Sequence, residues 1–251
     1  MAELKKIVDF LDEELKVDEI EDSSNNGLQV DGKKAIDKIA FAVDACQEVF
    51  EKAVDAGADM IIVHHGISWA DSLKFLTDFN FSRVKTLIKN DVALYACHLP
   101  LDRHEKYGNN IRLAKLLDLK EVKEFGDYHG DTIGYMGKFE SAVTADELKK
   151  ILDEKLDTES LVLAFGKEKI STIGIVSGGG GSALGEAIEK ADCFLTGEAS
   201  HHLYHEAKEG KINMIIAGHY QTETLGVKAL MPLLKEKFGV ETIFIDVPTP
   251  I

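Results

Sequence analysis

The feature of this sequence that most constrains its fold is an internal repeat of a strand–helix–strand unit. Residues 39–66 align with residues 173–199 with a one-residue gap. Each copy has an apolar strand-like run, a turn, a helical pattern, an Ala-Asp pair and a second apolar run. The repeat predicts two related α/β halves that face each other across a pseudo-twofold axis.

The alignment continues into the next apolar run, where residues 93–102 match residues 214–223. Both segments carry a His-x3-acid unit, so the repeat is expected to hold functional as well as structural residues. The matching pairs are His98 with His219 and Asp102 with Glu223.

Short runs rich in β-branched residues alternate with helical patterns along the whole chain, which predicts an α/β fold with mixed, largely parallel sheets. Strands are predicted at residues 39–43, 60–63, 92–97, 131–140, 172–176, 193–196, 213–217 and 242–247. Helices are predicted at residues 1–15, 46–57, 81–90, 110–119 and 144–156, the last opening with the capping box Thr144-x2-Glu147.

The predicted strand at 131–140 opens a second unit, so we expect two interlinked domains. The first domain combines residues 1–125 with residues 211–251 and carries most of the candidate metal ligands. The second domain spans residues 126–210.

The composition excludes several classes of protein. A formal net charge of −15 makes nucleic acid an unlikely partner, because phosphate binding requires a basic surface. The three cysteines are far apart, which predicts neither a disulfide framework nor a thiolate zinc site. The amphipathic start is unlike a signal peptide, and no apolar run approaches the ~20 residues that span a bilayer. We therefore expect a cytoplasmic protein that does not enter membranes.

Three polar clusters each follow the end of a predicted strand. They are His64-His65, His98-x3-Asp102 and His219-x3-Glu223. The carboxyl ends of parallel strands face the ligand crevice of an open α/β sheet, so these clusters are expected to converge. Imidazole and carboxylate together suit Zn, Mn, Fe, Co or Ni, and carboxylates can bridge two ions.

A single histidine at a strand end is more often a hydrogen-bonded structural residue than a ligand. The adjacent pair His64 and His65 cannot point the same way within a regular strand, because side chains alternate. A metal-binding turn at the strand end explains the pair. Two His-x3-acid units at equivalent places in the repeat are also hard to attribute to packing, so the combination favours a metal site.

Five blocks of the sequence resemble the signature of the Nif-three-like family, also known as the NGG-one-interacting factor three group or as YbgI-like GTP cyclohydrolase 1 type 2 homologues. The resemblance covers nearly the whole chain in the right order. The blocks are SNNGLQV (24–30), GADMIIVHHG (57–66), ALYACHLPLD (93–102), TGEASHH (196–202) and AGHYQTE (217–223).

The resemblance implies a dinuclear centre of two divalent metal ions. It places the ligands at His64, His65, Asp102, His219 and Glu223, with His98 beside the centre as a ligand or a supporting group. It also implies two interlinked α/β domains and a homohexamer built as a trimer of dimers.

The function implied by the resemblance is a metal-dependent hydrolase that acts on a small-molecule nucleotide, as a GTP cyclohydrolase does. The alternative is a metal-stabilised ring-shaped scaffold that binds proteins or single-stranded nucleic acid. Relatives commonly have Pro where this chain has Gly66, and the chain is too short for the middle domain that some relatives insert.

Two weaker signals do not involve the candidate metal ligands. The turn Gly178–Gly181 formally fits a dinucleotide fingerprint, but a tight turn with positive φ is the simpler interpretation. A nicotinamide cofactor is accordingly the weakest of the hypotheses considered. Glu198 and His201 are candidate substrate contacts, since the repeat sets Glu198 opposite His65; a solvated helix face explains them equally well.

Overall fold

The computed structural model describes residues 1–250, and their contacts divide the chain into two units. Unit 1 consists of Met1–Leu101 and Gly226–Val247; unit 2 consists of Asp102–Leu225 and the C-terminal residues from Pro248. The sequence assigned residues 102–125 and 211–225 to the first domain, whereas their contacts group them with unit 2. The reason is that they supply a helix and a central strand to the core of that unit.

Unit 1 is built on a five-stranded sheet in the order β13-β4-β5-β6-β2. The first four strands are parallel, and β2 is antiparallel to β6. The strands are β2 (Gly27–Val30), β4 (Lys38–Asp44), β5 (Met60–His65), β6 (Ala93–Ala96) and β13 (Glu241–Phe244), and β1 (Ala2–Glu3) forms a separate antiparallel pair with β3 (Ala35–Ile36).

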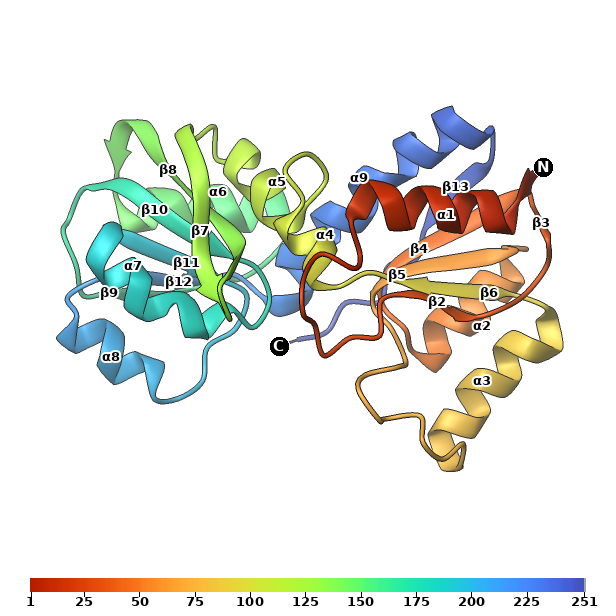
Figure 1. The fold of residues 1–251 in the computed structure, drawn as a ribbon. Helices are drawn as coiled ribbons and strands as arrows, with labels where there is room; N and C mark the ends of the chain where they lie inside the picture. Colours follow the sequence, from red (N-terminus) through yellow and green to blue (C-terminus); the bar gives the residue numbers. More distant parts are fainter. Residues whose placement is uncertain (251) are drawn as a thin grey trace. The chain divides into compact units, whose positions relative to one another are not determined.

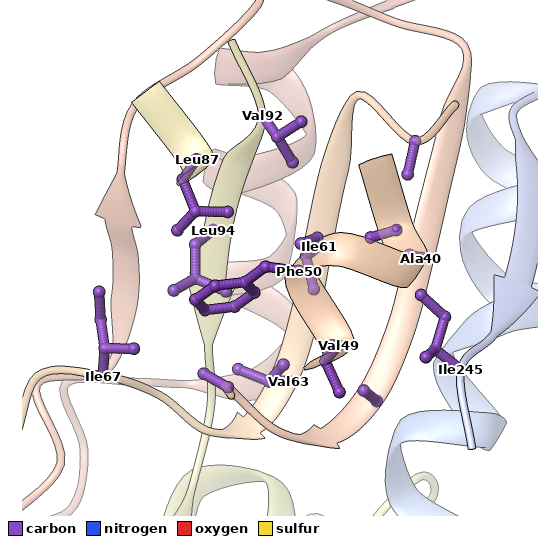
Figure 2. Close-up of a cluster of buried hydrophobic side chains, with 14 of the residues drawn as sticks. Ala40, Val49, Phe50, Ile61, Val63, Ile67, Leu87, Val92, Leu94 and Ile245 are labelled. Carbon is purple, nitrogen blue, oxygen red and sulfur yellow. The ribbon is translucent and has the colours of Figure 1, made fainter. Parts of the chain in front are cut away.

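The helices of unit 1 are α1 (Leu4–Leu15), α2 (Gln47–Asp55), α3 (Asp78–Asn90) and the C-terminal part of α9 (His219–Phe238). Helices α2 and α3 cover one face of the sheet (Figure 1). Figure 2 shows their core, in which Val49 and Phe50 of α2 and Leu87 of α3 pack on alternate strand residues such as Ile61 and Val63. The alternation follows from the pleat of the strands, which turns successive side chains to opposite faces.

Unit 2 contains a six-stranded sheet in the order β7-β8-β10-β11-β12-β9. Strands β10, β11 and β12 are parallel, and the remaining strands join the sheet antiparallel. Their bounds are β7 (Lys120–Tyr128), β8 (Asp131–Val143), β9 (Leu161–Ala164), β10 (Ile170–Val176), β11 (Cys193–Thr196) and β12 (Asn213–Ile216).

Helices cover both faces of this second sheet (Figure 1). The helices α5 (Asn109–Leu116) and α6 (Ala145–Leu156) pack on one face, where Leu113 and Leu148 lie in the core beside Ile173. The other face carries α7 (Leu184–Lys190), preceded by a 3₁₀ turn (Gly180–Ala183), and α8 (Leu203–Glu209). The predicted capping box at the start of α6 is confirmed, because Thr144 and Glu147 bond each other's backbone N–H.

The repeat is confirmed in the sheets, since β4-β5-β6 and β10-β11-β12 are both parallel triplets flanked by an antiparallel strand. The third strand, however, is offset by one residue from the sequence alignment. Cys97 N–H donates to Val63 at 3.0 Å, and Ala217 N–H donates to Thr196 at 2.9 Å. Val63 and Thr196 are equivalent, so His98 corresponds to Gly218 in the sheet, not to His219.

The helices of the chain also bear on the membrane prediction. Among the described residues, no helix combines the length and the apolar character that crossing a bilayer would require.

Candidate metal centre

Three of the predicted site residues come together in unit 1. His64 and His65 end β5, and His98 lies two residues beyond β6. Their ring centroids are 4.7 Å apart for His64 and His65, 5.1 Å for His64 and His98, and 5.5 Å for His65 and His98. Each ring can offer one nitrogen such that all three lie within 4.8 Å of one another. The indole of Trp69 packs against His98, with 5.0 Å between ring centroids.

The hydrogen bonds of His64 and His65 fix which nitrogen each ring presents. His64 is fully buried, and its Nδ1 lies 2.9 Å from the backbone carbonyl of Cys97. His65 Nδ1 lies 2.8 Å from Asp44 Oδ1, at the end of β4. An oxygen acceptor at Nδ1 selects the tautomer that carries its proton there and places the lone pair on Nε2, the nitrogen that could ligate a metal ion.

His98 has the same arrangement. Its Nδ1 lies 2.9 Å from Asp22 Oδ1, and the Asp22 carboxylate also accepts the backbone N–H groups of Ser24 and Leu99. Burial alone would raise the pKa of Asp22, but the bonds from His98 and Asn26 outweigh it and lower this pKa to about 2. Asp22 is therefore held as a carboxylate that orients the His98 ring.

The other three predicted ligands gather in unit 2 around the turn Ser177–Gly178. Ser177 Oγ donates to Asp102 Oδ1 at 3.1 Å, and Asn109 Nδ2 donates to the same oxygen at 2.9 Å. His219 Nε2 lies 3.1 Å from Glu223 Oε2, one helical turn along α9. Asp102 and Glu223 are 5% and 2% exposed, so two carboxylates are buried here. Buried carboxylates require a cation or several donors to offset their desolvation.

Gly178 explains why the turn beside these carboxylates is rich in glycine. Its φ is +57°, and a Cβ at this position would lie 2.0 Å from Glu223 Oε1 and 3.0 Å from His219 Nε2. The backbone can approach the two side chains this closely only because residue 178 has none. The turn is thus part of the site wall, and the tight-turn interpretation is confirmed for Gly178.

His219 is held by a carboxylate on each ring nitrogen, because its Nδ1 lies 3.2 Å from Glu198 Oε2. Burial would lower the pKa of His219, but the bonds to Glu223 and Glu198 outweigh it and raise this pKa to about 9. The four histidines His64, His65, His98 and His219 therefore share one feature: each has an oxygen atom at Nδ1.

The two predicted substrate contacts differ in their surroundings. Glu198 is bonded to His219, so it lies at the candidate site, and it also lines a neighbouring pocket. His201 is exposed in the turn before α8, with its ring centroid 6.4 Å from that of His205.

Sequence reasoning missed the groups that orient the histidines: Asp22, Asp44 and the carbonyl of Cys97. Asp44 was detectable, because it ends the first strand of the repeat just as His65 ends the second. Asp22 lies in an irregular segment, and a backbone carbonyl leaves no trace in a sequence pattern.

The donor set fits a divalent transition metal. Zn, Mn, Fe, Co and Ni all accept imidazole nitrogen and carboxylate oxygen, and ligating histidines characteristically donate their second N–H to a carboxylate or carbonyl. Both features are present in the described residues, and clusters of His, Asp and Glu that could hold a metal ion are thus part of this structure.

Comparison with known proteins decides the family. The family model Duf34/NIF3 (NGG1p interacting factor 3) matches residues 2–250. The chain belongs to the Duf34/NIF3 family. Curated Duf34/NIF3 relatives include a "GTP cyclohydrolase 1 type 2 homolog" of Pyrococcus abyssi, 48% identical over 98% of this chain and 99% of that protein. Another with the same name, from Archaeoglobus fulgidus, is 42% identical over 98% of each chain.

Solved structures agree with the Duf34/NIF3 assignment. The protein ybgI, described as of unknown function, is 34% identical with a TM-score of 0.93 and covers 99% of this chain and 100% of its own. TTHA1606 from Thermus thermophilus is 36% identical with a TM-score of 0.92 at the same coverage. The α/β fold with largely parallel sheets is therefore the fold of the family.

Proposed function

We propose that this protein is a metal-dependent hydrolase that holds two divalent ions with His64, His65, Asp102, His219 and Glu223, supported or joined by His98. The observation that carries the proposal is the shared orientation of the four histidines. An oxygen at Nδ1 is the arrangement that ligating histidines characteristically show, and all four have it; in His219 the carboxylate of Glu223 also lies at Nε2.

Two helices of the chain contain the boundaries between the two units. Helix α4 (Leu99–Arg103) contains the boundary between Leu101 and Asp102, and α9 contains the boundary after Leu225. His98 directly precedes α4, and Asp102 lies within it. We propose that the histidines and the carboxylates serve one metal centre because the family resemblance assigns them to the same ligand set, and the metal content of their variants tests this.

In the proposed hydrolase, the metal ions and the surrounding side chains have different roles. Bound divalent ions would lower the pKa of water and polarise the electrophilic atom of a substrate. Asp102 and Glu223 are the carboxylates suited to bridging, and Ser177 and Asn109 hold Asp102 in place. Glu198 and Asp44 fix the rings of His219 and His65. Glu198 is also exposed toward a neighbouring pocket, where it can contact a substrate directly.

For the substrate we propose a nucleotide or a compound derived from one, with attack on the imidazole ring of a purine. The support is the name of the curated relatives, "GTP cyclohydrolase 1 type 2 homolog". The test is incubation of metal-loaded protein with GTP and its dephosphorylated forms, followed by detection of formate and of new ultraviolet absorption. If none of these compounds yields formate or new ultraviolet absorption, the ring-opening reaction is refuted.

A second candidate is a ring-shaped binding protein that uses the metals for stability. It is favoured by exposed apolar side chains on and before α3, among them Phe75 at 73% and Phe79 at 65% exposure. The hexamer proposed for the family could bury such side chains between copies. Asp102→Asn and Glu223→Gln separate the two functions: a hydrolase loses turnover but keeps its assembly, whereas a scaffold loses assembly or partner binding.

A further inference from the structure

Unit 2 contains a pocket of about 810 Å³ beside β9, β12 and the first turn of α9. Its lining includes Glu198, whose carboxylate holds His219 Nδ1, and Gly218, which directly precedes His219. The pocket thus adjoins a histidine that the proposed function assigns to the metal centre. The inference about the ligand of this pocket therefore rests on the proposed function.

The polar side chains of the pocket are rich in hydrogen-bond acceptors. Asp157, Glu159 and Glu198 contribute three carboxylates, and no Lys or Arg is among the lining residues that the structure describes. Gln221 Oε1 is buried and has no hydrogen-bond partner within the described part of the chain. A buried acceptor without a donor costs free energy, so a ligand that donates a hydrogen bond there is favoured.

The remaining wall of the pocket is apolar. Leu161 of β9 is 58% exposed although it is a large aliphatic side chain, and Ile216 of β12 and Pro250 lie in the same lining. Exposed aliphatic side chains grouped in a concave site can bury the face of a ring. The combination of an apolar wall with acceptors suits a heterocycle that carries N–H groups.

We propose that this pocket binds the ring of the substrate, and that the substrate is an uncharged or cationic nucleoside or base rather than a nucleoside triphosphate. The carboxylates of Asp157 and Glu159, in a protein of formal net charge −15, repel a triphosphate and attract a cation, whereas that of Glu198 is already paired with His219. In this proposal the carboxylates and Gln221 Oε1 accept hydrogen bonds from the N–H groups of the ring. His219, which adjoins the pocket, belongs to the proposed metal centre.

Calorimetric titration of metal-free protein with 7-methylguanosine in its cationic form, guanosine and GTP tests the proposal. We expect the cation and guanosine to bind at least tenfold more tightly than GTP. Asp157→Asn and Glu159→Gln should each tighten GTP binding about threefold to tenfold and weaken binding of the cation; guanosine, which carries no charge, should change less than either because Asn and Gln keep an acceptor oxygen. Glu154→Gln, on α6 and outside the lining, removes the same charge and should change none of them.

GTP binding as tight as that of guanosine, or no binding of any of the three, would overturn the pocket assignment. Repeating the titration after metal loading separates this failure from a failure of the proposed function. A protein that binds metal and GTP but not guanosine keeps the metal centre and loses the pocket proposal. A protein that binds guanosine but no metal keeps the pocket proposal and loses the hydrolase.

Discussion

Asp59 and Asp192 make the same three hydrogen bonds, each within its own sheet. Asp59 accepts from Lys33 Nζ at 2.6 Å and from two backbone N–H groups before and at the start of β4, at 2.9 and 3.2 Å. Asp192 accepts from Lys167 Nζ at 2.7 Å and from two N–H groups of β10, at 3.0 and 3.1 Å. The Asp of each Ala-Asp pair in the repeat therefore stabilises the start of the neighbouring strand through hydrogen bonds.

Removal of the Asp59 side chain is predicted to lower the stability of the fold by an amount that depends on pH. Burial would raise the pKa of Asp59 and of Asp192, but the bonds from lysine and backbone outweigh it and lower both. Because the folded pKa lies below the unfolded one, this stabilisation is present above about pH 4 and is lost as pH falls further. Asp59→Ala should lower the free energy of unfolding by about 1–3 kcal/mol at pH 7.

Denaturant unfolding at pH 7 and pH 3 measures this effect. The loss caused by Asp59→Ala should shrink at pH 3, because the carboxyl group of the unfolded wild-type chain is mostly protonated there and the folded carboxylate loses part of its stabilisation. Asp31→Ala is the matched control, since Asp31 also pairs with a lysine but is exposed. Equal losses in both variants at pH 7 would show that the buried bonds of Asp59 add nothing.

Much of this fold could be predicted from the sequence, because buried parallel strands are nearly continuous apolar runs. All predicted strands correspond to observed strands, with ends shifted by a few residues. Strand β7 was missed because its sequence, KEVKEFGDY, is charged and only Phe125 and Gly126 are buried. Strand β9 was missed because both of its ends are exposed at the edge of the sheet.

The candidate ligands could be proposed from the sequence, whereas the atoms that orient them could not. A strand-end histidine is visible as a residue type, but its Nδ1 partner depends on which segments fold beside it. His98 and Asp22 are 76 residues apart in the chain, and Ser177 and Asp102 are 75 apart. Long-range pairs of this kind have no periodicity to reveal them.

Gly178 should be essential to the site. In Gly178→Ala, the new methyl group would meet the Glu223 carboxylate and the backbone would keep an unfavourable positive φ. We expect about 1–3 kcal/mol lower stability together with loss of metal binding. Gly185→Ala is the control, because a Cβ at Gly185 of α7 meets nothing within 4 Å. Metal retention in Gly178→Ala would mean that Glu223 does not need its present position.

Asp44 should matter for metal affinity although it is not a predicted ligand. In Asp44→Ala, His65 loses the acceptor that fixes its Nδ1 proton, so its ring is no longer held for coordination. Loss of such a partner typically weakens metal binding about 10–100-fold. Competition with a chelating dye measures the affinity, and Glu48→Ala, an exposed change on α2, should leave it at the wild-type value. Unaltered affinity in Asp44→Ala would remove His65 from the ligand set.

The most direct test of the dinuclear centre is the metal content of the protein purified without chelators. We predict about two divalent ions per chain, with His64→Ala and Glu223→Gln each losing metal while remaining folded. His202→Ala, an exposed histidine before α8, should keep both ions. A folded wild-type protein that contains no metal, and takes up none when Zn or Mn is added, would contradict the dinuclear centre and with it the proposed hydrolase.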